Sequence, residues 1–550
     1  MSVDQGARRG TPALTDSPQG LLPGGRLAAV PAWLPILLVA LLARLPALTT
    51  KPLWYDEALA VLLSTKGPAA VLEATLTVQD GVAANVHPPG YFMLLWAWGR
   101  LLGTSPGSAR LLSILIGLGT VGLAIRLAHD SLGAGTARIA GWMLALSPFL
   151  VHYAQEVRMY GLLALELVAA AAVYRSALRQ GGLARWLGFA GLAAAAQYTH
   201  SLAALFLLPL ALIPVWRRQW LAAARTASAG TLALLLYVPW LLHLPSQIAR
   251  VRQAYWISAP GAVEILRTLV IYVGGSPLPR FALPAVLFTG LLLMLLGAWA
   301  LMRGLGRGEE TGRVAAGAAY LALVPLVLMF AISLWQPIYL DRAMLPAGVA
   351  FLFWIAWTLS AGSLPARLRQ TGLVFLLVSF GLGLGGYYTY RGFPYAPFEE
   401  LAAQLRSSLL PGEVVLHSNK LSAIPTAYYG PDFEQRYLPD LPGSASDTLA
   451  EATQRVLGLV AERDIATAVG DAPGVWFIVF RRERQEYADL GYSQHPGLSW
   501  LQTHFDWEQT LAFGELELHH FGGPPSQAVE RPAVATGSRS VSACLRPCRT

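Results

Sequence analysis

Apolar blocks of membrane-spanning length, separated by short polar segments, dominate the chain from about residue 29 to about residue 390. A bilayer core needs a helix of about 17–25 mainly apolar residues to cross it. The blocks predict about eleven transmembrane helices, at residues 29–48, 109–127, 138–152, 158–175, 186–199, 201–216, 226–243, 281–302, 314–334, 343–360 and 371–389. This pattern is typical of an α-helical polytopic membrane protein.

Arginines cluster in alternate loops between these blocks. The clusters precede the first block and follow the second, fourth, sixth, eighth and tenth, beginning with Arg8, Arg126, Arg175, Arg217, Arg303 and Arg367. Basic loops stay on the cytoplasmic side of a membrane, so the other loops face outward. Arg250, Arg252 and Arg267 are exceptions, but they lie in a long outer loop, where the rule is weaker.

The segment His87–Gly103 is ambiguous, because it is apolar but barely long enough to cross and it contains Arg100. Counting it as a span would reverse the side of every later arginine cluster. We therefore interpret it as an interfacial or re-entrant helix inside a large first outer loop, residues 49–108. The same loop is expected to hold short amphipathic helices near residues 56–65 and 68–79.

The composition becomes that of a soluble protein after about residue 396. "FEELAAQLRSSLLPGEVVLHS" predicts a helix and then a strand, "VWFIVF" a buried strand and "LAFGELELHHF" another strand. Alternating helices and strands predict a small α/β domain, which the arginine pattern puts on the outer side. The expected organisation is a disordered cytoplasmic arm (1–28), a transmembrane domain (29–390), an extracytoplasmic α/β domain (396–522) and a disordered tail (523–550).

Composition supports the membrane assignment and narrows the function. The chain is 55% hydrophobic and 13% charged, with a mean hydropathy of +0.48, whereas soluble domains carry about 25% charged residues. The net charge of +8 does not indicate nucleic acid, since the arginines lie between apolar blocks and signal topology. The two cysteines, Cys544 and Cys548, both lie in the final tail and imply neither a disulfide framework nor a zinc site.

Polar residues gather in separate outer loops. They are Asp56 and Glu57 after the first block, Asn85 and His87 later in that loop, Gln155, Glu156, Arg158 and Tyr160 after the third block, His200 after the fifth, and Tyr339, Asp341 and Arg342 after the ninth. Arginine suits a phosphate through its fixed fork of donors. A partly desolvated Asp suits a general base, because desolvation raises a carboxyl pKa toward the working pH.

Each of these features also has a structural interpretation. The acid pair is typical of a helix start, and the Pro88–Pro89 pair of a turn before a helix. Glu156 and Arg158 fit a structural ion pair, while Trp54, Tyr55 and Tyr339 fit interfacial anchors. Glu166 is an acid within a predicted span, and we expect it to pair with Arg110 or Arg44.

Four motifs in order carry a resemblance to a known group. "LWYDEA", "HPPGYFMLLWAWGRLLG", "YAQEVRMYGLLAL" and "PIYLDRAMLP" together resemble the membrane glycosyltransferases of the C-type fold, in the protein mannosyltransferase-like branch that includes the aminoarabinose transferase of lipid A. The resemblance covers about Trp33 to Tyr390. It implies transfer of a sugar from a polyprenyl-phosphate carrier to a lipid, glycan or protein acceptor, with inversion, at the outer face of the cytoplasmic membrane.

The resemblance also implies roles for individual residues. Asp56 matches the acidic residue that the family has in its first outer loop, and it becomes the candidate base. Glu57 would orient Asp56 or bind the acceptor. His87 and Pro88 would shape the donor pocket. Further substrate contacts are expected from Tyr55, Gln155, Glu156, Arg158, Tyr160, Tyr339 and Arg342, with Arg158 and Arg342 on the phosphate.

Two departures limit the resemblance. Arg342 is followed by Ala343 where the motif often has tyrosine, and the aminoarabinose enzymes have Lys-Pro in place of His87-Pro88, so their donor specificity does not transfer. Metal dependence varies across the fold, no loop shows a convincing ligand set, and we predict no essential metal. Two other hypotheses remain open, a lipid-linked saccharide flippase and a non-catalytic glycan-binding sensor.

Overall fold

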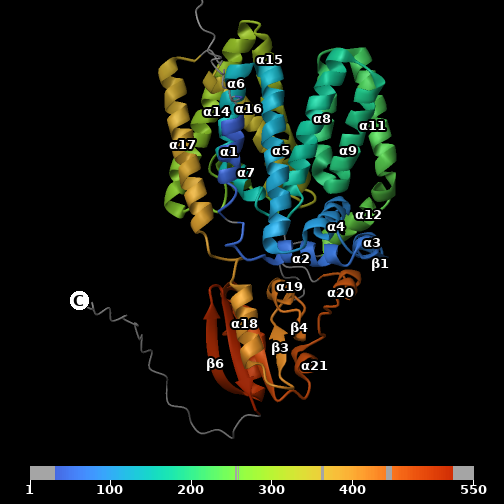
Figure 1. The fold of residues 1–550 in the computed structure, drawn as a ribbon, viewed down its shortest axis with the longest axis vertical. Coiled ribbons are helices and arrows are strands. Elements are labelled where there is room, and N and C mark those ends of the chain that lie inside the picture. Colours follow the sequence, from blue (N-terminus) through green and yellow to red (C-terminus); the bar gives the residue numbers. More distant parts are fainter. Residues whose placement is uncertain are drawn as a thin grey trace, which may run out of the picture.

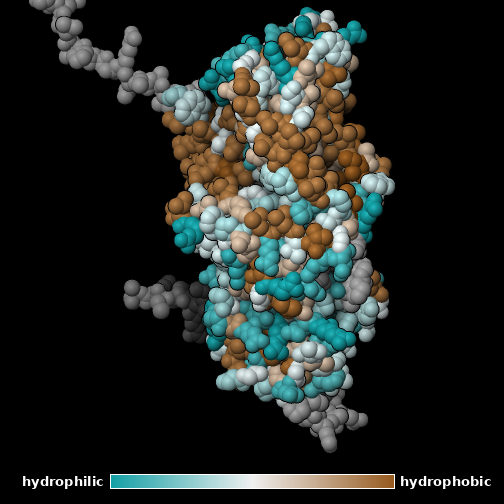
Figure 2. Space-filling model, turned by 90° about the vertical axis from the view of Figure 1, so that its right-hand side faces the viewer, coloured by the Kyte–Doolittle hydropathy of each residue, from teal (hydrophilic) through white to brown (hydrophobic). Residues whose placement is uncertain are grey.

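The computed structural model describes residues 31, 33–46, 48–253, 257, 259–360, 364–440 and 449–523. Within them a helical bundle stands on a smaller unit built around a β-sheet (Figure 1). On the face shown in Figure 2, hydrophobic residues form a broad band over the bundle, whereas the sheet unit is mainly hydrophilic. The arm predicted over residues 1–28 and nearly all of the predicted tail lie outside the described residues.

Seven described helices are long and apolar enough to cross a membrane. They include α5 (Pro106–Leu132), α8 (Tyr160–Gln180), α11 (Trp220–Leu241), α14 (Leu283–Gly306), α15 (Glu310–Ser333), α16 (Leu345–Ser360) and α17 (Ala366–Thr389). The other four predicted spans also contain helices, but shorter ones: α1 (Leu34–Leu42), α6 (Ala134–Leu146), α9 (Leu183–Thr199) and α10 (Ala204–Trp216). The chain is a multi-pass membrane protein.

Local sequence signals explain where several of these helices end. Ser105 caps α5 by accepting a hydrogen bond from the Ser108 amide, and Pro106 occupies its first turn. Gly133, at φ +88°, ends α5 and begins α6. The predicted span 138–152 is divided, because Ser147 and Pro148 end α6 and begin α7 (Pro148–Tyr153).

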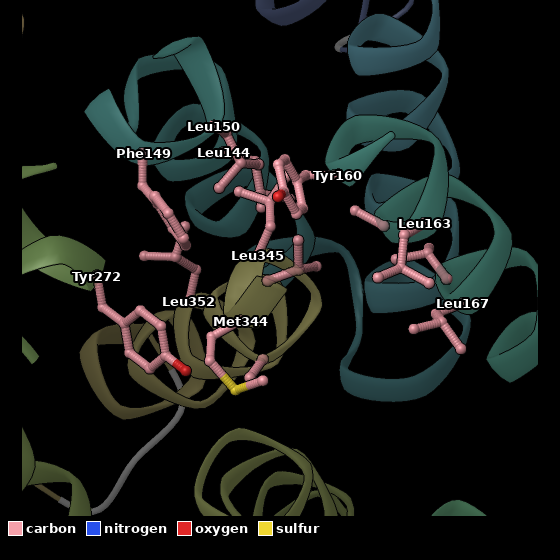
Figure 3. Packing of buried hydrophobic residues seen from close by; sticks show 14 of the residues in the cluster. Leu144, Phe149, Leu150, Tyr160, Leu163, Leu167, Tyr272, Met344, Leu345 and Leu352 are labelled. Carbon is pink, nitrogen blue, oxygen red and sulfur yellow. The ribbon is translucent and has the colours of Figure 1, made fainter. Parts of the chain in front are cut away.

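The core of the bundle forms around α16. Every residue of this helix except Ala350 and Ser360 is buried. It packs against α6, α8, α14 and α15. Figure 3 shows Leu345 and Leu352 of α16 between side chains of α7, α8 and α13 (Ala262–Gly274).

The first outer loop folds into short helices along one end of the bundle. They are α2 (Tyr55–Thr65), α3 (Pro68–Leu76) and α4 (Gly90–Leu102), with a small hairpin of β1 (Val78–Gln79) and β2 (Val82–Ala83). The helix expected near residues 68–79 therefore ends earlier, and residues 78–79 form a strand. The 13 residues of α4 give a length of about 20 Å, too short to cross a bilayer core.

The segments at the same end of the bundle also contain α12 (Leu244–Gln253) and the short 3-10 helices η1 (Ser201–Ala203), η2 (Arg280–Ala282) and η3 (Asp341–Met344). The helix α12 contacts β2 of the first loop, so two loops distant in sequence meet at this end of the bundle.

The C-terminal unit is a five-stranded sheet in the order β4-β3-β5-β7-β6. Its strands are β3 (Val414–His417), β4 (Gln435–Tyr437), β5 (Gly474–Phe480), β6 (Asp506–Phe513) and β7 (Leu516–Gly522). Strands β4, β3 and β5 are parallel, and β7 and β6 are antiparallel to their neighbours. The small C-terminal α/β unit predicted from the sequence is therefore present.

Helices pack on both faces of this sheet: α18 (Phe398–Ser408) on one face, and α21 (Ile465–Val469) and α23 (Pro496–His504) on the other. The unit also contains α19 (Lys420–Tyr429), α20 (Glu451–Leu457) and α22 (Arg481–Asp489). "VWFIVF" lies in the fully buried β5, as predicted. "LAFGELELHHF" was predicted as one strand, which is wrong, because the chain reverses at Gly514 (φ +58°) and the segment spans β6 and β7.

The carboxyl ends of the parallel strands face the bundle. Phe480, the last residue of β5, contacts Phe393 in the segment that follows α17, with 5.1 Å between ring centroids. The sheet is thus oriented so that α19, which follows β3, lies beneath the first outer loop (Figure 1).

Candidate functional site

Asp56 and Glu57 lie in the first turn of α2, after an extended residue, Trp54. Successive side chains of a helix point about 100° apart, so the two carboxylates face different neighbours. The Asp56 side chain is 14% exposed and that of Glu57 only 1%. The two acids therefore have separate environments.

Asp56 is the centre of an ion cluster formed by three loops. Its Oδ2 atom lies 3.1 Å from an Arg342 guanidinium nitrogen and 3.8 Å from Nε of Arg158. Arg342 comes from η3, which leads into α16, and Arg158 from the segment between α7 and α8. Another Arg158 nitrogen donates to the Asp56 backbone carbonyl at 3.4 Å.

His87 extends this cluster. Its Nε2 lies 3.4 Å from a terminal nitrogen of Arg158, and its ring meets that of His200 edge to face at 5.5 Å. Burial, with the charge of Arg158, holds the pKa of His87 well below its usual range. A neutral His87 accepts the hydrogen bond from the guanidinium. Pro88 beside it is buried and leads into α4.

Tyr160 lies under Arg342, with the guanidinium carbon 5.4 Å from the ring centroid. The side chain is fully buried (Figure 3), and no described residue bonds its hydroxyl. A ring in this position stabilises the cation through its π face.

Glu156 is a second acid near Asp56, and it is buried. Burial raises the pKa of Glu156 to about 8, and the nearby charges of Glu57 and Asp56 add to this, while Arg342 opposes it. Among the described residues nothing bonds its Oε2 atom. The group is therefore protonated at neutral pH and has a hydrogen-bonding atom left for a ligand.

Glu57 lies outside this cluster. Arg110 of α5 contacts it twice, at 3.2 and 2.8 Å, and the Val157 amide donates to it at 3.0 Å. Both side chains of the Glu57–Arg110 pair are at least 98% buried. The resemblance implies that Glu57 orients Asp56 or binds the acceptor. In the structure its carboxylate is engaged by Arg110 and the Val157 amide.

Three other predicted residues make contacts with groups outside this cluster. The Tyr339 hydroxyl bonds Thr268 and the Glu264 carbonyl on the α13 side. Gln155 accepts from the Tyr387 hydroxyl at 2.8 Å. Tyr55 is half-buried and packs against the main hydrophobic cluster. The cluster that does form consists of Asp56, His87, Glu156, Arg158, Tyr160 and Arg342.

Lys51 is a functional candidate that the sequence reasoning missed. Its Nζ donates to the Tyr387 carbonyl at 2.8 Å and lies 3.6 Å above the Tyr387 ring. Burial lowers the pKa of Lys51 to about 7, with the charges of Arg391 and Arg110 acting in the same direction. Its position five residues before Asp56 was a sequence signal for a role near the site. Its aromatic partners, Tyr387 at the end of α17 and Tyr395 after it, are distant in sequence and could not be predicted.

The expected partners of Glu166 are also wrong. Arg110 pairs with Glu57, and Arg44 donates to the carbonyls of Ala40, Leu144 and Ala145. Thr199 is the polar neighbour of Glu166 instead. Arg44 therefore binds backbone carbonyls and Arg110 binds Glu57 of α2, so neither arginine pairs with Glu166 of α8.

The cluster can bind an anion. Two guanidinium groups converge on one point and provide forked donors suited to a phosphate. In this structure the Asp56 carboxylate occupies that point. Within the described ranges no group of three His, Cys, Asp or Glu side chains is arranged to hold a metal ion.

Comparisons with known proteins support the expected family. A model of the dolichyl-phosphate-mannose-protein mannosyltransferase family matches residues 86–243, a segment that contains His87, Glu156 and Arg158. The comparison with curated protein sequences gives no match.

Solved structures share the fold over most of the chain. ArnT from Cupriavidus metallidurans bound to undecaprenyl phosphate matches with a TM-score of 0.58 and 16% identity, over 88% of this chain and 97% of ArnT. Its apo state gives 0.57 and 15%, over the same shares. The apo oligosaccharyltransferase of Archaeoglobus fulgidus gives 0.51 and 12%, over 90% of this chain and 74% of that one. The chain therefore has the C-type fold of these membrane glycosyltransferases, and its residues 86–243 carry the match to the protein mannosyltransferase family that its motifs predicted.

Proposed function

We propose that the protein is an inverting glycosyltransferase. It moves a sugar from a polyprenyl-phosphate carrier to an acceptor hydroxyl of a lipid, glycan or protein, at the outer face of the cytoplasmic membrane. The observation that carries this proposal is the convergence of Arg158 and Arg342 on the Asp56 carboxylate. One cluster then holds both the groups for a leaving phosphate and a base.

In the proposed step the acceptor oxygen attacks the anomeric carbon of the sugar. The bond between that carbon and the phosphate oxygen breaks, and its electron pair stays on the polyprenyl phosphate. Asp56 takes the hydroxyl proton of the acceptor. Arg158 and Arg342 neutralise the charge that develops on the phosphate. Such stabilisation of developing charge by fixed groups is usually the largest single contribution to catalysis.

Other residues of the cluster would contact the donor sugar. Protonated Glu156 offers a donor to a sugar oxygen, and the Tyr160 hydroxyl has the same capacity. His87 orients Arg158 through its neutral ring nitrogen. We assign Glu57 a positioning role, because its pair with Arg110 fixes the start of α2.

Both comparisons support this substrate class. The matching family takes its name from a dolichyl-phosphate-mannose donor, and ArnT was solved with undecaprenyl phosphate bound. The outer location rests on the arginine clusters near the carboxyl ends of α5, α8, α10, α14 and α16, which are the ends of these helices opposite to Asp56. The C-terminal unit shares the side of Asp56 (Figure 1).

Sugar transfer from radiolabelled polyprenyl-phosphate donors by the purified protein tests the proposal. Wild type should transfer label, and Asp56→Asn should not. Asp432→Asn is the matched control, since it removes one acid from an exposed pair with Arg406 in the C-terminal unit. Full transfer by Asp56→Asn would exclude Asp56 as the base. Donor binding without transfer in wild type would favour the sensor, and movement of the intact lipid-linked sugar across the membrane would favour the flippase.

A further inference from the structure

The C-terminal unit packs directly on the helix that carries Asp56. Its helix α19 contacts α2, and α20 contacts α3 (Figure 1). Ile424 of α19 is fully buried and belongs to the same hydrophobic cluster as Ala58 and Leu59 of α2. The contact is thus a continuous core rather than two polar surfaces that touch.

Two tyrosines at the end of α19 reach into the bundle. The Tyr429 hydroxyl accepts a hydrogen bond from the Leu53 amide at 2.9 Å, and the Tyr428 hydroxyl donates to the Thr104 carbonyl at 2.9 Å. Leu53 is fully buried and lies three residues before Asp56. Thr104 lies in the turn between α4 and α5. The neighbouring tyrosines therefore hold two different turns, only one of which leads to Asp56.

The turn before α2 is fixed from two opposite elements. Arg110 of α5 donates to the carbonyls of Lys51 and Pro52 and pairs with Glu57. Tyr429 holds the intervening Leu53 amide. A buried backbone N–H or carbonyl group without a hydrogen-bond partner destabilises the folded protein. Each of these bonds therefore restricts the path of the turn.

Tyr429 links this turn to the sheet. Its ring packs against the main cluster of the bundle and also against the cluster between the sheet and α18. Burial raises the pKa of Tyr429 to about 12, so the hydroxyl stays protonated. A ring held by both cores keeps its hydroxyl at a fixed place, which a surface contact would not do.

We propose that Tyr429 is a positioning residue for Asp56, and that the C-terminal α/β unit buttresses the turn that presents this carboxylate. The inference rests on the proposed function, which gives Asp56 its role. Removing the hydroxyl leaves the Leu53 amide without its acceptor and lets the turn shift. A shift of about 1 Å in a reacting group can cost about a hundredfold in rate.

Tyr429→Phe and Tyr428→Phe form a matched pair. Each removes one hydroxyl from one end of α19 and leaves the ring in place. For the full-length protein we expect Tyr429→Phe to lower the kcat of sugar transfer by about ten- to hundredfold, with an unchanged KM for the donor. Tyr428→Phe should keep both constants. Thermal unfolding should show similar losses of stability in the two variants, because each loses one buried hydrogen bond.

Amide hydrogen exchange of the peptide over residues 51–57, on the same samples, makes the test independent of activity. Exchange should be faster in Tyr429→Phe than in wild type and unchanged in Tyr428→Phe. Unchanged exchange in Tyr429→Phe would overturn the inference, and so would equal losses of kcat in both variants. If wild type transfers no sugar, the proposed function fails, while the exchange data still decide whether Tyr429 holds the turn.

Discussion

Replacing Asp56 with asparagine should increase the affinity of the protein for polyprenyl phosphate while abolishing sugar transfer. The Asp56 carboxylate lies 3.1 Å from Arg342 and 3.8 Å from Arg158, where the proposed phosphate would bind. Carboxylate and phosphate then compete for the same guanidinium groups. Asparagine keeps the size of the side chain and removes its charge, so the competition ends.

The size of the effect follows from the contact that the phosphate displaces. The side chains of Asp56 and Arg342 are 14% and 16% exposed, so water screens the pair only in part. A hydrogen bond to a charged group contributes about 1.5–3 kcal/mol, and 1.4 kcal/mol corresponds to about a tenfold change in affinity. We expect the Kd of polyprenyl phosphate to fall by about ten- to hundredfold in Asp56→Asn.

The assay is a binding titration of polyprenyl phosphate against full-length protein in nanodiscs. Arg342→Ala should weaken binding, and adding Asp56→Asn to it should recover little, because the contested group is gone. Asp432→Asn controls for the change of net charge. An unchanged or higher Kd for Asp56→Asn would refute the competition, and an equal gain with Arg342 absent would refute Arg342 as the shared group.

Three further substitutions test the neighbouring groups. Glu57→Ala should lower the free energy of unfolding by about 3–5 kcal/mol in chemical denaturation, because it leaves Arg110 as a buried unpaired charge; a loss below about 1 kcal/mol would contradict this. The raised pKa of Glu156, about 8 against 4.5, means that the folded protein keeps a proton that the unfolded chain releases, so this group makes stability fall as pH rises from 4.5 to 8. Glu156→Gln should remove that part of the slope in melting curves, and an identical slope would place the titration elsewhere. Tyr339→Phe should leave the affinity for polyprenyl phosphate unchanged, because its hydroxyl bonds Thr268 on the α13 side, and weaker binding in the same titration would return Tyr339 to the site.

Hydrophobic patterning was sufficient to predict the membrane fold and the small α/β unit. Among the described residues each of the eleven predicted segments contains a helix, because apolar blocks of this length have few other stable forms in a bilayer. The division of the third segment at Ser147 and Pro148 had a visible signal, since proline donates no backbone hydrogen bond and disfavours the helical conformation of the residue before it. The β6–β7 hairpin also had one in Gly514, at the reversal between two short apolar runs.

Ion-pair partners were harder to predict than elements. Asp56 and Glu57 are adjacent, yet one pairs with Arg342, 286 residues away, and the other with Arg110, 53 residues away. Helical geometry predicts that the two side chains diverge, but the partner of each depends on tertiary packing between distant helices. The aromatic contacts of Lys51 are of the same kind, because Tyr387 and Tyr395 meet it only after α17 packs beside the first loop.

A structure of the full-length protein with polyprenyl phosphate bound tests the central claim most directly. The account predicts a phosphate held between Arg158 and Arg342, with the Asp56 carboxylate displaced from Arg342 and turned toward the space for the acceptor. A phosphate bound elsewhere, with the pair between Asp56 and Arg342 intact, would contradict it.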